Sequence, residues 1–182
     1  MRLATTFVAL VAAAVCAVPA SAGGAANDPL RLVLQRADFP AKVRWTSQRS
    51  PAFEKTLANA GLKGKAAFYS ADIARGSTET VLVSGVVIAL PNAAQARRAF
   101  ASYKNVFPAT QRDIVRLTAY GDEQVAVVPT QPGVRADLRV RTGAVVWRLE
   151  IKWAGTDRFT RSQALAELKT YATKQKRRVG RG

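Results

Sequence analysis

The stretch AVVWRLEIKW (residues 144–153) has the most regular pattern in the chain and decides the fold. From Val145 onward, apolar residues alternate with residues that are mostly charged. A period of two is typical of a β-strand with one dry face and one wet face. We therefore predict a strand here, with Trp147 and Trp153 in the core. The two faces are Val145, Trp147, Leu149, Ile151 and Trp153 on the dry side, and Val146, Arg148, Glu150 and Lys152 on the wet side.

The preceding stretch VRADLRVR (residues 134–141) alternates in the same way and predicts the partner strand of a β-hairpin. Thr142-Gly143 is expected to be the loop, because the glycine can adopt the positive φ of a tight turn. A four-residue loop with the same register is also compatible with the sequence. This register predicts two cross-strand ion pairs, Asp137 with Arg148 and Arg135 with Glu150.

The first 22 residues have the three-part pattern of a secretory signal peptide. A charge at Arg2 precedes an apolar run, and the run ends in the small residues ASA (20–22). We expect cleavage after residue 22, a flexible linker over 23–27, a secreted or envelope-associated location and no membrane span afterwards. An uncleaved anchor and lipidation at Cys16 are the alternatives.

Cleavage would remove the only cysteine and the only methionine, and the chain contains no histidine. The mature protein then has no thiol nucleophile, no Ser-His-Asp triad, no disulfide and no thiolate or imidazole metal site. We therefore expect no cofactor, no metal and no catalytic residue, and we predict that the protein is not an enzyme.

The remaining pattern predicts one α+β domain over residues 28–178, with a basic tail end at 179–182. Short turns between successive strands require a largely antiparallel sheet. We expect a two-layer sandwich in which helices cover one face of that sheet. The other expected elements are helices at 28–37, 52–60, 92–107 and 161–176, and strands at 42–45, 67–74, 78–90, 114–120 and 124–130.

Five stretches together resemble a group of secreted bacterial α+β domains that includes the extracellular sensor domains of the PknH-like type. The resemblance implies a non-enzymatic, envelope-facing role in binding or sensing. The stretches are LVLQRADFPAKVRW (32–45), TETVLVSGVVIAL (78–90), PNAAQARRAF (91–100), YGDEQVAV (120–127) and RVRTGAVVWRLEI (139–151).

The formal net charge of +16 gives the chain a strong positive field. Basic residues gather on the wet face of the hairpin and at the C-terminal end of the last helix. We predict an anion-binding surface for cell-wall polymer or lipid headgroups, without specific nucleic-acid recognition. A solvated sheet face and cations that complement a helix dipole are the simpler interpretation. The predicted anion-binding residues are Arg135, Arg139, Arg141, Arg148, Lys152, Lys174, Lys176, Arg177 and Arg178.

Three functions are compatible with these patterns. The first is a secreted, non-catalytic binding or sensor-like module of the cell envelope. The second is a cationic protein that attaches electrostatically to anionic polymer, lipid or nucleic acid. The third is a carboxylate-dependent hydrolase, for which Asp122-Glu123 is one possible pair, although two adjacent acids in a turn are more typical of a solvated loop.

Overall fold

The fold was analysed in a computed structural model, which describes residues 28–75, 79–104, 113–130, 135–154 and 160–181. The predicted signal peptide at 1–22 and the linker at 23–27 lie outside the described residues. None of the helices in the described part of the chain is both long enough and apolar enough to cross a membrane.

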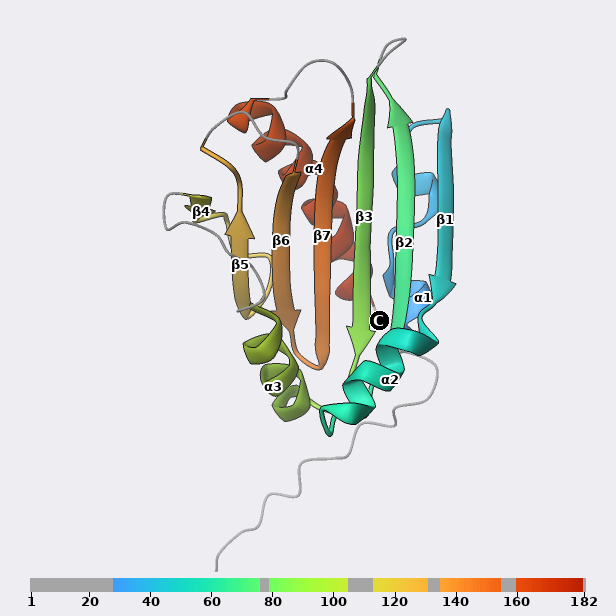
Figure 1. The fold of residues 1–182 in the computed structure, drawn as a ribbon, viewed down its shortest axis with the longest axis vertical. Helices are drawn as coiled ribbons and strands as arrows, with labels where there is room; N and C mark the ends of the chain where they lie inside the picture. Colours follow the sequence, from blue (N-terminus) through green and yellow to red (C-terminus); the bar gives the residue numbers. More distant parts are fainter. Residues whose placement is uncertain (1–27, 76–78, 105–112, 131–134, 155–159, 182) are drawn as a thin grey trace, which may run out of the picture.

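A single seven-stranded sheet with the strand order β1-β2-β3-β7-β6-β5-β4 forms the centre of the domain (Figure 1). Every neighbouring pair is antiparallel, which confirms the predicted α+β class and the antiparallel sheet. The strands are β1 (Val43–Arg49), β2 (Lys65–Ala74), β3 (Thr80–Ala89), β4 (Ile114–Val115), β5 (Glu123–Val127), β6 (Arg135–Thr142) and β7 (Val145–Ala154).

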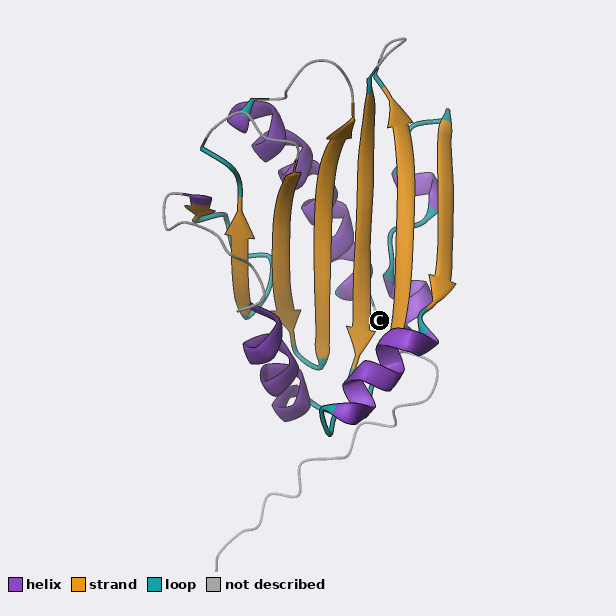
Figure 2. Cartoon of the chain, in the orientation of Figure 1, coloured by secondary structure: helices purple, strands orange, loops and turns teal. Residues whose placement is uncertain are grey.

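Helices lie on both faces of this sheet (Figure 2). One face packs against α1 and α4, and we call it the core face. The opposite face packs against α2 and α3 and is called the groove face. We expected helices on one face of the sheet only. Helices α1 and α4 do share one face, but α2 and α3 pack against the other. The helices are α1 (Pro29–Leu32), the 3-10 turn η1 (Arg36–Asp38), α2 (Pro51–Asn59), α3 (Ala93–Lys104) and α4 (Arg161–Val179).

The core face holds the larger of the two apolar clusters. Trp147 and Leu149 of β7 are fully buried there, and they belong to the same cluster as Leu168 and Tyr171 of α4. The prediction that Trp147 is a core residue is confirmed. Trp153 is partly buried and packs at the margin of this cluster.

Gly85 on β3 leaves room in this core for the side chain of Tyr69. A Cβ at Gly85 would meet the hydroxyl oxygen of Tyr69 at 2.6 Å and the carbonyl oxygen of Arg148 at 2.3 Å. The register of β3 is continuous through this residue. The glycine therefore marks a close approach rather than a bulge.

The second apolar cluster lies at one end of the groove face. Leu57 of α2 and Phe100 of α3 cover Ile88 and Val146 there. Both helices cover only the end of the sheet, so that the strands extend beyond them (Figure 1). The groove face is consequently closed at one end and open at the other.

Two expected elements are much shorter than predicted. The first helix keeps its cap, because Asp28 accepts a hydrogen bond from the Leu30 amide at 3.1 Å, but it ends at Leu32. Val33 and Leu34 are both fully buried and continue as extended chain. A surface helix cannot bury every successive residue, and this explains the early end.

The strand expected at 114–120 is limited to Ile114–Val115. Beyond Val115, the side chain of Gln124 forms hydrogen bonds with the backbone in place of strand-to-strand hydrogen bonds. Its Nε2 donates to the carbonyl of Leu117 at 3.0 Å, and its Oε1 accepts from the Tyr120 amide at 2.8 Å.

The hairpin of β6 and β7 forms as predicted, but its register is shifted. Thr142 pairs with Val145, so the loop is Gly143-Ala144. Gly143 has a φ of +56°, and Ala144 has a negative φ. A positive φ at the first loop position alone is the pattern of a type II′ turn, which needs glycine there and leaves Thr142 in the strand.

Candidate functional site

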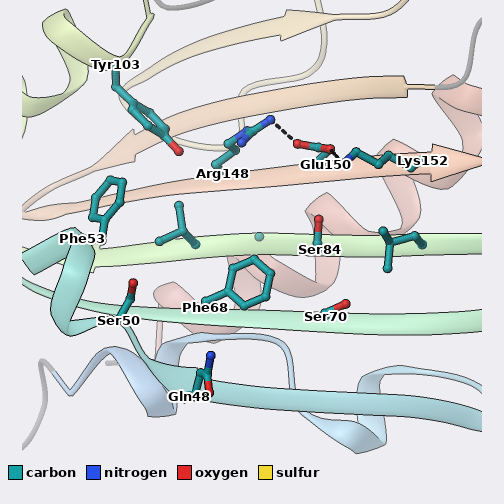
Figure 3. Close-up of a pocket in the computed structure, with 13 residues that line it drawn as sticks. Gln48, Ser50, Phe53, Phe68, Ser70, Ser84, Tyr103, Arg148, Glu150 and Lys152 are labelled. Carbon is teal, nitrogen blue, oxygen red and sulfur yellow. Dashed lines mark hydrogen bonds and ion pairs between the residues drawn. The ribbon is translucent and has the colours of Figure 1, made fainter.

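An open groove of about 420 Å³ runs along the groove face beside α2 and α3. Strands β1, β2, β3 and β7 provide its floor and one wall, while α2 contributes Phe53 and α3 contributes Tyr103 (Figure 3). Its volume falls within the range of small-molecule sites, about 300 to 1,000 Å³.

The strand register organises the groove side chains into parallel rows. Residues two positions apart on a strand share a face and are separated by about 7 Å. The rows across β2, β3 and β7 are Phe68, Val86 and Arg148; then Ser70, Ser84 and Glu150; then Asp72, Leu82 and Lys152. The floor on β2 and β3 thus changes from apolar to hydroxyl-bearing side chains and then to Asp72 and Leu82, while the wall on β7 is charged along its whole length.

The end nearest the helices is aromatic. Phe53 and Tyr103 form an edge-to-face pair with ring centroids 6.3 Å apart. Phe68 lies on the adjacent floor and is 38% exposed, although it is a large apolar side chain. The exposed ring of Phe68 offers apolar area on the floor of this hollow.

The wall on β7 and β6 is a network of ion pairs in which each carboxylate contacts several cations. Glu150 pairs with Arg135 and Lys152, both at 2.9 Å, and with Arg148. Asp137 is 3% exposed and pairs with Arg139 at 2.9 Å and with Arg148. Burial at such a site requires that every charge be paired, because an isolated buried charge is costly.

This network corrects the predicted cross-strand pairing. Like charges lie directly opposite each other, with Asp137 facing Glu150 and Arg139 facing Arg148. The expected ion pairs, Asp137 with Arg148 and Arg135 with Glu150, do form, but they connect diagonal neighbours. The shift of the loop by one residue produces this change.

Arg148 is held at the centre of the wall by Asp137 and Glu150, and the hydroxyl of Tyr103 points toward it (Figure 3). Burial lowers its pKa, but Asp137, Tyr103 and Glu150 outweigh that effect, so the pKa is raised. Burial raises the pKa of Tyr103, although Arg148 and Arg139 oppose the change. Arg139 also lies over the Tyr103 ring, 4.8 Å from its centroid. At neutral pH Arg148 is therefore charged, and Tyr103 keeps its proton.

The wall has more positive than negative charge. Four cations surround the two carboxylates of Asp137 and Glu150, leaving an excess of two positive charges. Lys152 is the most exposed cation among them, with 48% of its side chain accessible. A ligand anion would meet this ammonium group first.

The predicted anion-binding residues are not brought together into one surface. Arg135, Arg139, Arg148 and Lys152 belong to the wall network just described. Arg141 instead pairs with Asp122 at 2.8 Å and with Glu123 at 2.6 Å. Asp122 and Glu123 thus anchor an arginine of β6.

The other four predicted residues lie on α4, on the opposite side of the sheet. Lys174 and Arg178 contact the carbonyl and the carboxylate of Asp38, and Lys176 donates to the carbonyl of Ala119 at 3.0 Å. These contacts attach the helix to the domain. Arg177 is exposed. Helix α4 continues beyond the predicted end at residue 176, and Val179 packs in the core.

Sequence reasoning missed the floor of the groove, above all Phe68, Ser70 and Ser84. The signal was present in KAAFYSADIA (65–74), where Tyr69 and Ile73 alternate with Phe68 and Ser70. An aromatic residue among polar ones on the wet side of a central strand indicates a contact surface.

The fold and this groove define the chain as an α+β domain with a ligand-sized hollow on the uncovered part of one sheet face. Comparisons with protein-family models, with curated proteins and with solved structures found no match to the chain. Over the described ranges, no group of three or more acidic, cysteine or histidine residues is arranged to hold a metal ion.

Proposed function

We propose that the protein is a secreted, non-catalytic binding or sensor-like module of the cell envelope, and that its ligand occupies the groove. The observation that carries the proposal is the exposed Phe68 on the floor of a hollow of about 420 Å³. The larger apolar cluster lies on the other face of the sheet, and Phe68 belongs to neither apolar cluster.

The state of the groove carboxylates supports binding rather than hydrolysis. A glycosidase needs one carboxylic acid that donates a proton and a second that acts as nucleophile or base. Asp137 is 3% exposed and held by arginines, and Glu150 is surrounded by Arg135, Arg148 and Lys152. Carboxylates engaged in this way serve to orient the cations of the wall.

The test is to locate binding on the domain by NMR. The isotope-labelled mature chain is titrated with lipid, glycan and soluble fractions of a cell envelope, and amide shifts are recorded. We expect shifts on β2, β3 and β7 and none on α4. The variant Ser84→Trp should abolish them by filling the centre of the floor, where Ser84 is 9% exposed. Shifts confined to α4, or identical shifts in the filled variant, would overturn the proposal.

The net charge of +16 supports electrostatic attachment to an anionic polymer as a second candidate. Such binding would fall steeply and log-linearly with salt concentration for any polyanion. Replacing Arg177, which is exposed on α4, would weaken it, while Ser84→Trp would leave it unchanged. The same two variants therefore distinguish the two candidates.

A further inference from the structure

The order of side chains along the groove also gives information about the chemistry of its ligand. Beside a wall of ion-paired charges on β7, the rows place an apolar floor, then a hydroxyl-bearing floor, and then the most exposed cation, Lys152. At about 3.4 Å per residue, the first row is separated from the third by about 13 Å. An occupant must be elongated to contact all three.

The first row takes an apolar group. Phe68 and Val86 form its floor, and the edge-to-face pair of Phe53 and Tyr103 closes its end. Figure 3 shows these rings gathered at the end of the groove where α2 begins. An aromatic or short acyl group would cover the exposed ring of Phe68.

The middle row takes a group that forms hydrogen bonds. Ser70 and Ser84 are directly opposite each other on β2 and β3. Within the described ranges neither hydroxyl has a hydrogen-bond partner, and both point into the groove (Figure 3). An amide, sulfonamide or hydroxyl group of the ligand would pair with them.

The last row takes an anion. Lys152 lines this end and uses one interaction for Glu150, which leaves donor capacity on its ammonium group. The excess of two positive charges on the wall adds to the attraction, and the one carboxylate on the floor of this row, Asp72, lies opposite Arg44 of β1. Arg148 is held by Asp137 and Glu150 and defines the wall without having to release either of them.

We infer that the groove binds an elongated anionic amphiphile, in which an apolar group is joined through a hydrogen-bonding linker to a carboxylate or phosphate about 13 Å away. The inference rests on the proposed function and specifies its ligand class. The apolar group contacts Phe68, the linker contacts Ser70 and Ser84, and the anion contacts Lys152.

Dansyl compounds provide probes of this chemistry, because the dansyl ring fluoresces more strongly and at shorter wavelength in an apolar site. Dansyl-ε-aminocaproate carries a ring, a sulfonamide and a carboxylate whose spacing matches the rows. Dansylglycine is too short, the corresponding caproamide is neutral, and dansylcadaverine is cationic. A dansyl-aminohexyl phosphate distinguishes a phosphate ligand from a carboxylate one. Fluorescence titration of the mature chain gives a Kd for each probe.

The caproate or phosphate probe should bind more tightly than dansylglycine and the neutral and cationic probes. Lys152→Gln should weaken the anionic probes about fivefold and leave the neutral probe unchanged. Phe68→Ser should weaken all of them about tenfold. Matched controls are Lys55→Gln, which removes an exposed charge from α2 outside the groove lining, and Ile114→Ser, which removes the exposed apolar residue of β4. Both controls should change Kd less than about twofold.

The possible outcomes distinguish failure of the proposed ligand class from failure of the proposed binding function. Equal affinity for the anionic, neutral and cationic probes, with loss in Phe68→Ser, would overturn the ligand class but support binding in the groove. Affinity that is unaffected by Phe68→Ser, or no binding by any probe, would overturn both. Thermal melting of each variant shows whether the fold is intact.

Discussion

The two faces of one sheet have opposite characters, although they alternate residue by residue along the same strands. On β7, Trp147, Leu149 and Ile151 of the core face are fully buried against α4 and its neighbours. On the groove face of the same strand, Arg148 and Glu150 belong to the ion-pair network. The core face therefore supplies apolar burial, while the groove face binds charges in a fixed arrangement.

This difference indicates where stability and function reside. An apolar cluster on one face provides the hydrophobic free energy of folding. A second apolar cluster under α2 and α3 is confined to one end of the other face, so the remaining surface can carry unpaired hydroxyls and an exposed ring. Substitutions on the two faces should consequently have different effects.

The largest difference is expected between two aromatic residues. Trp147→Ala should lower the free energy of unfolding by about 3 to 5 kcal/mol, because it leaves a cavity in the core face. Phe68→Ala on the groove face should lower it by about 1 to 2 kcal/mol, since the ring is 38% exposed and only its buried part contributes. Denaturant unfolding measures both. Similar losses for the two variants would contradict the division between the faces.

The ion-pair network is expected to give the second largest effect. Asp137→Asn keeps the shape of the side chain but leaves Arg139 and Arg148 without their shared buried carboxylate. Breaking a buried pair in this way should cost about 3 kcal/mol. Asp72→Asn is the matched control, because Asp72 is exposed on the same face, and its effect should stay within about 0.5 kcal/mol. A negligible effect at Asp137 would mean that water reaches the network.

A smaller loss of stability is expected for a substitution at Gly85, where the backbone of β3 lies very close to its neighbours. Gly85→Ala would place a methyl group 2.6 Å from the Tyr69 hydroxyl and 2.3 Å from the Arg148 carbonyl, so both must shift. Overpacking of this kind should cost about 1 to 3 kcal/mol. An unchanged unfolding midpoint would show that β3 and β7 separate easily at this position.

The sequence was sufficient for the parts of the fold that depend on local pattern. Alternation predicted the hairpin and placed Trp147 in the core, and the helix expected at 161–176 begins at Arg161 behind a capping box of Thr160 and Gln163. The face covered by α3 could not be predicted, because Phe100 and Ala96 show only that the helix has an apolar side. Which face that side packs against depends on its connections.

The groove was also beyond local pattern. Its rows combine residues of β2, β3 and β7, and β7 lies far from the other two strands in the sequence. The predicted anion-binding set was selected by charge and by position on the wet face of the hairpin or at the end of the last helix. Charge does not distinguish Lys152 at the groove from Lys174, which contacts the Asp38 carbonyl on the other side of the sheet.

Two tyrosines provide a finer comparison of the faces. Tyr69 is fully buried on the core face, and its hydroxyl has no hydrogen-bond partner among the described residues. Tyr69→Phe should therefore raise the free energy of unfolding by about 1 kcal/mol, because it removes an unsatisfied polar group. The hydroxyl of Tyr103 points toward Arg148 on the groove face (Figure 3), so Tyr103→Phe removes a polar contact and should lower the free energy of unfolding by about 1 kcal/mol. Denaturant unfolding at pH 7 to 8 should give these opposite signs.

The dependence of stability on alkaline pH provides a further test of the buried Tyr69 hydroxyl. Burial, assisted by Asp38, raises the pKa of this hydroxyl above its usual value of 10.0. Above pH 10 the unfolded chain loses the Tyr69 proton while the folded chain retains it, so the unfolded state binds fewer protons and stability falls as pH rises. The contribution is about 1.4 kcal/mol per pH unit. Tyr69→Phe removes it, and its advantage over the natural chain should therefore grow between pH 10 and 11. A constant difference across that range would mean that the hydroxyl is solvated in the folded state, and that the core face is open to water at this residue.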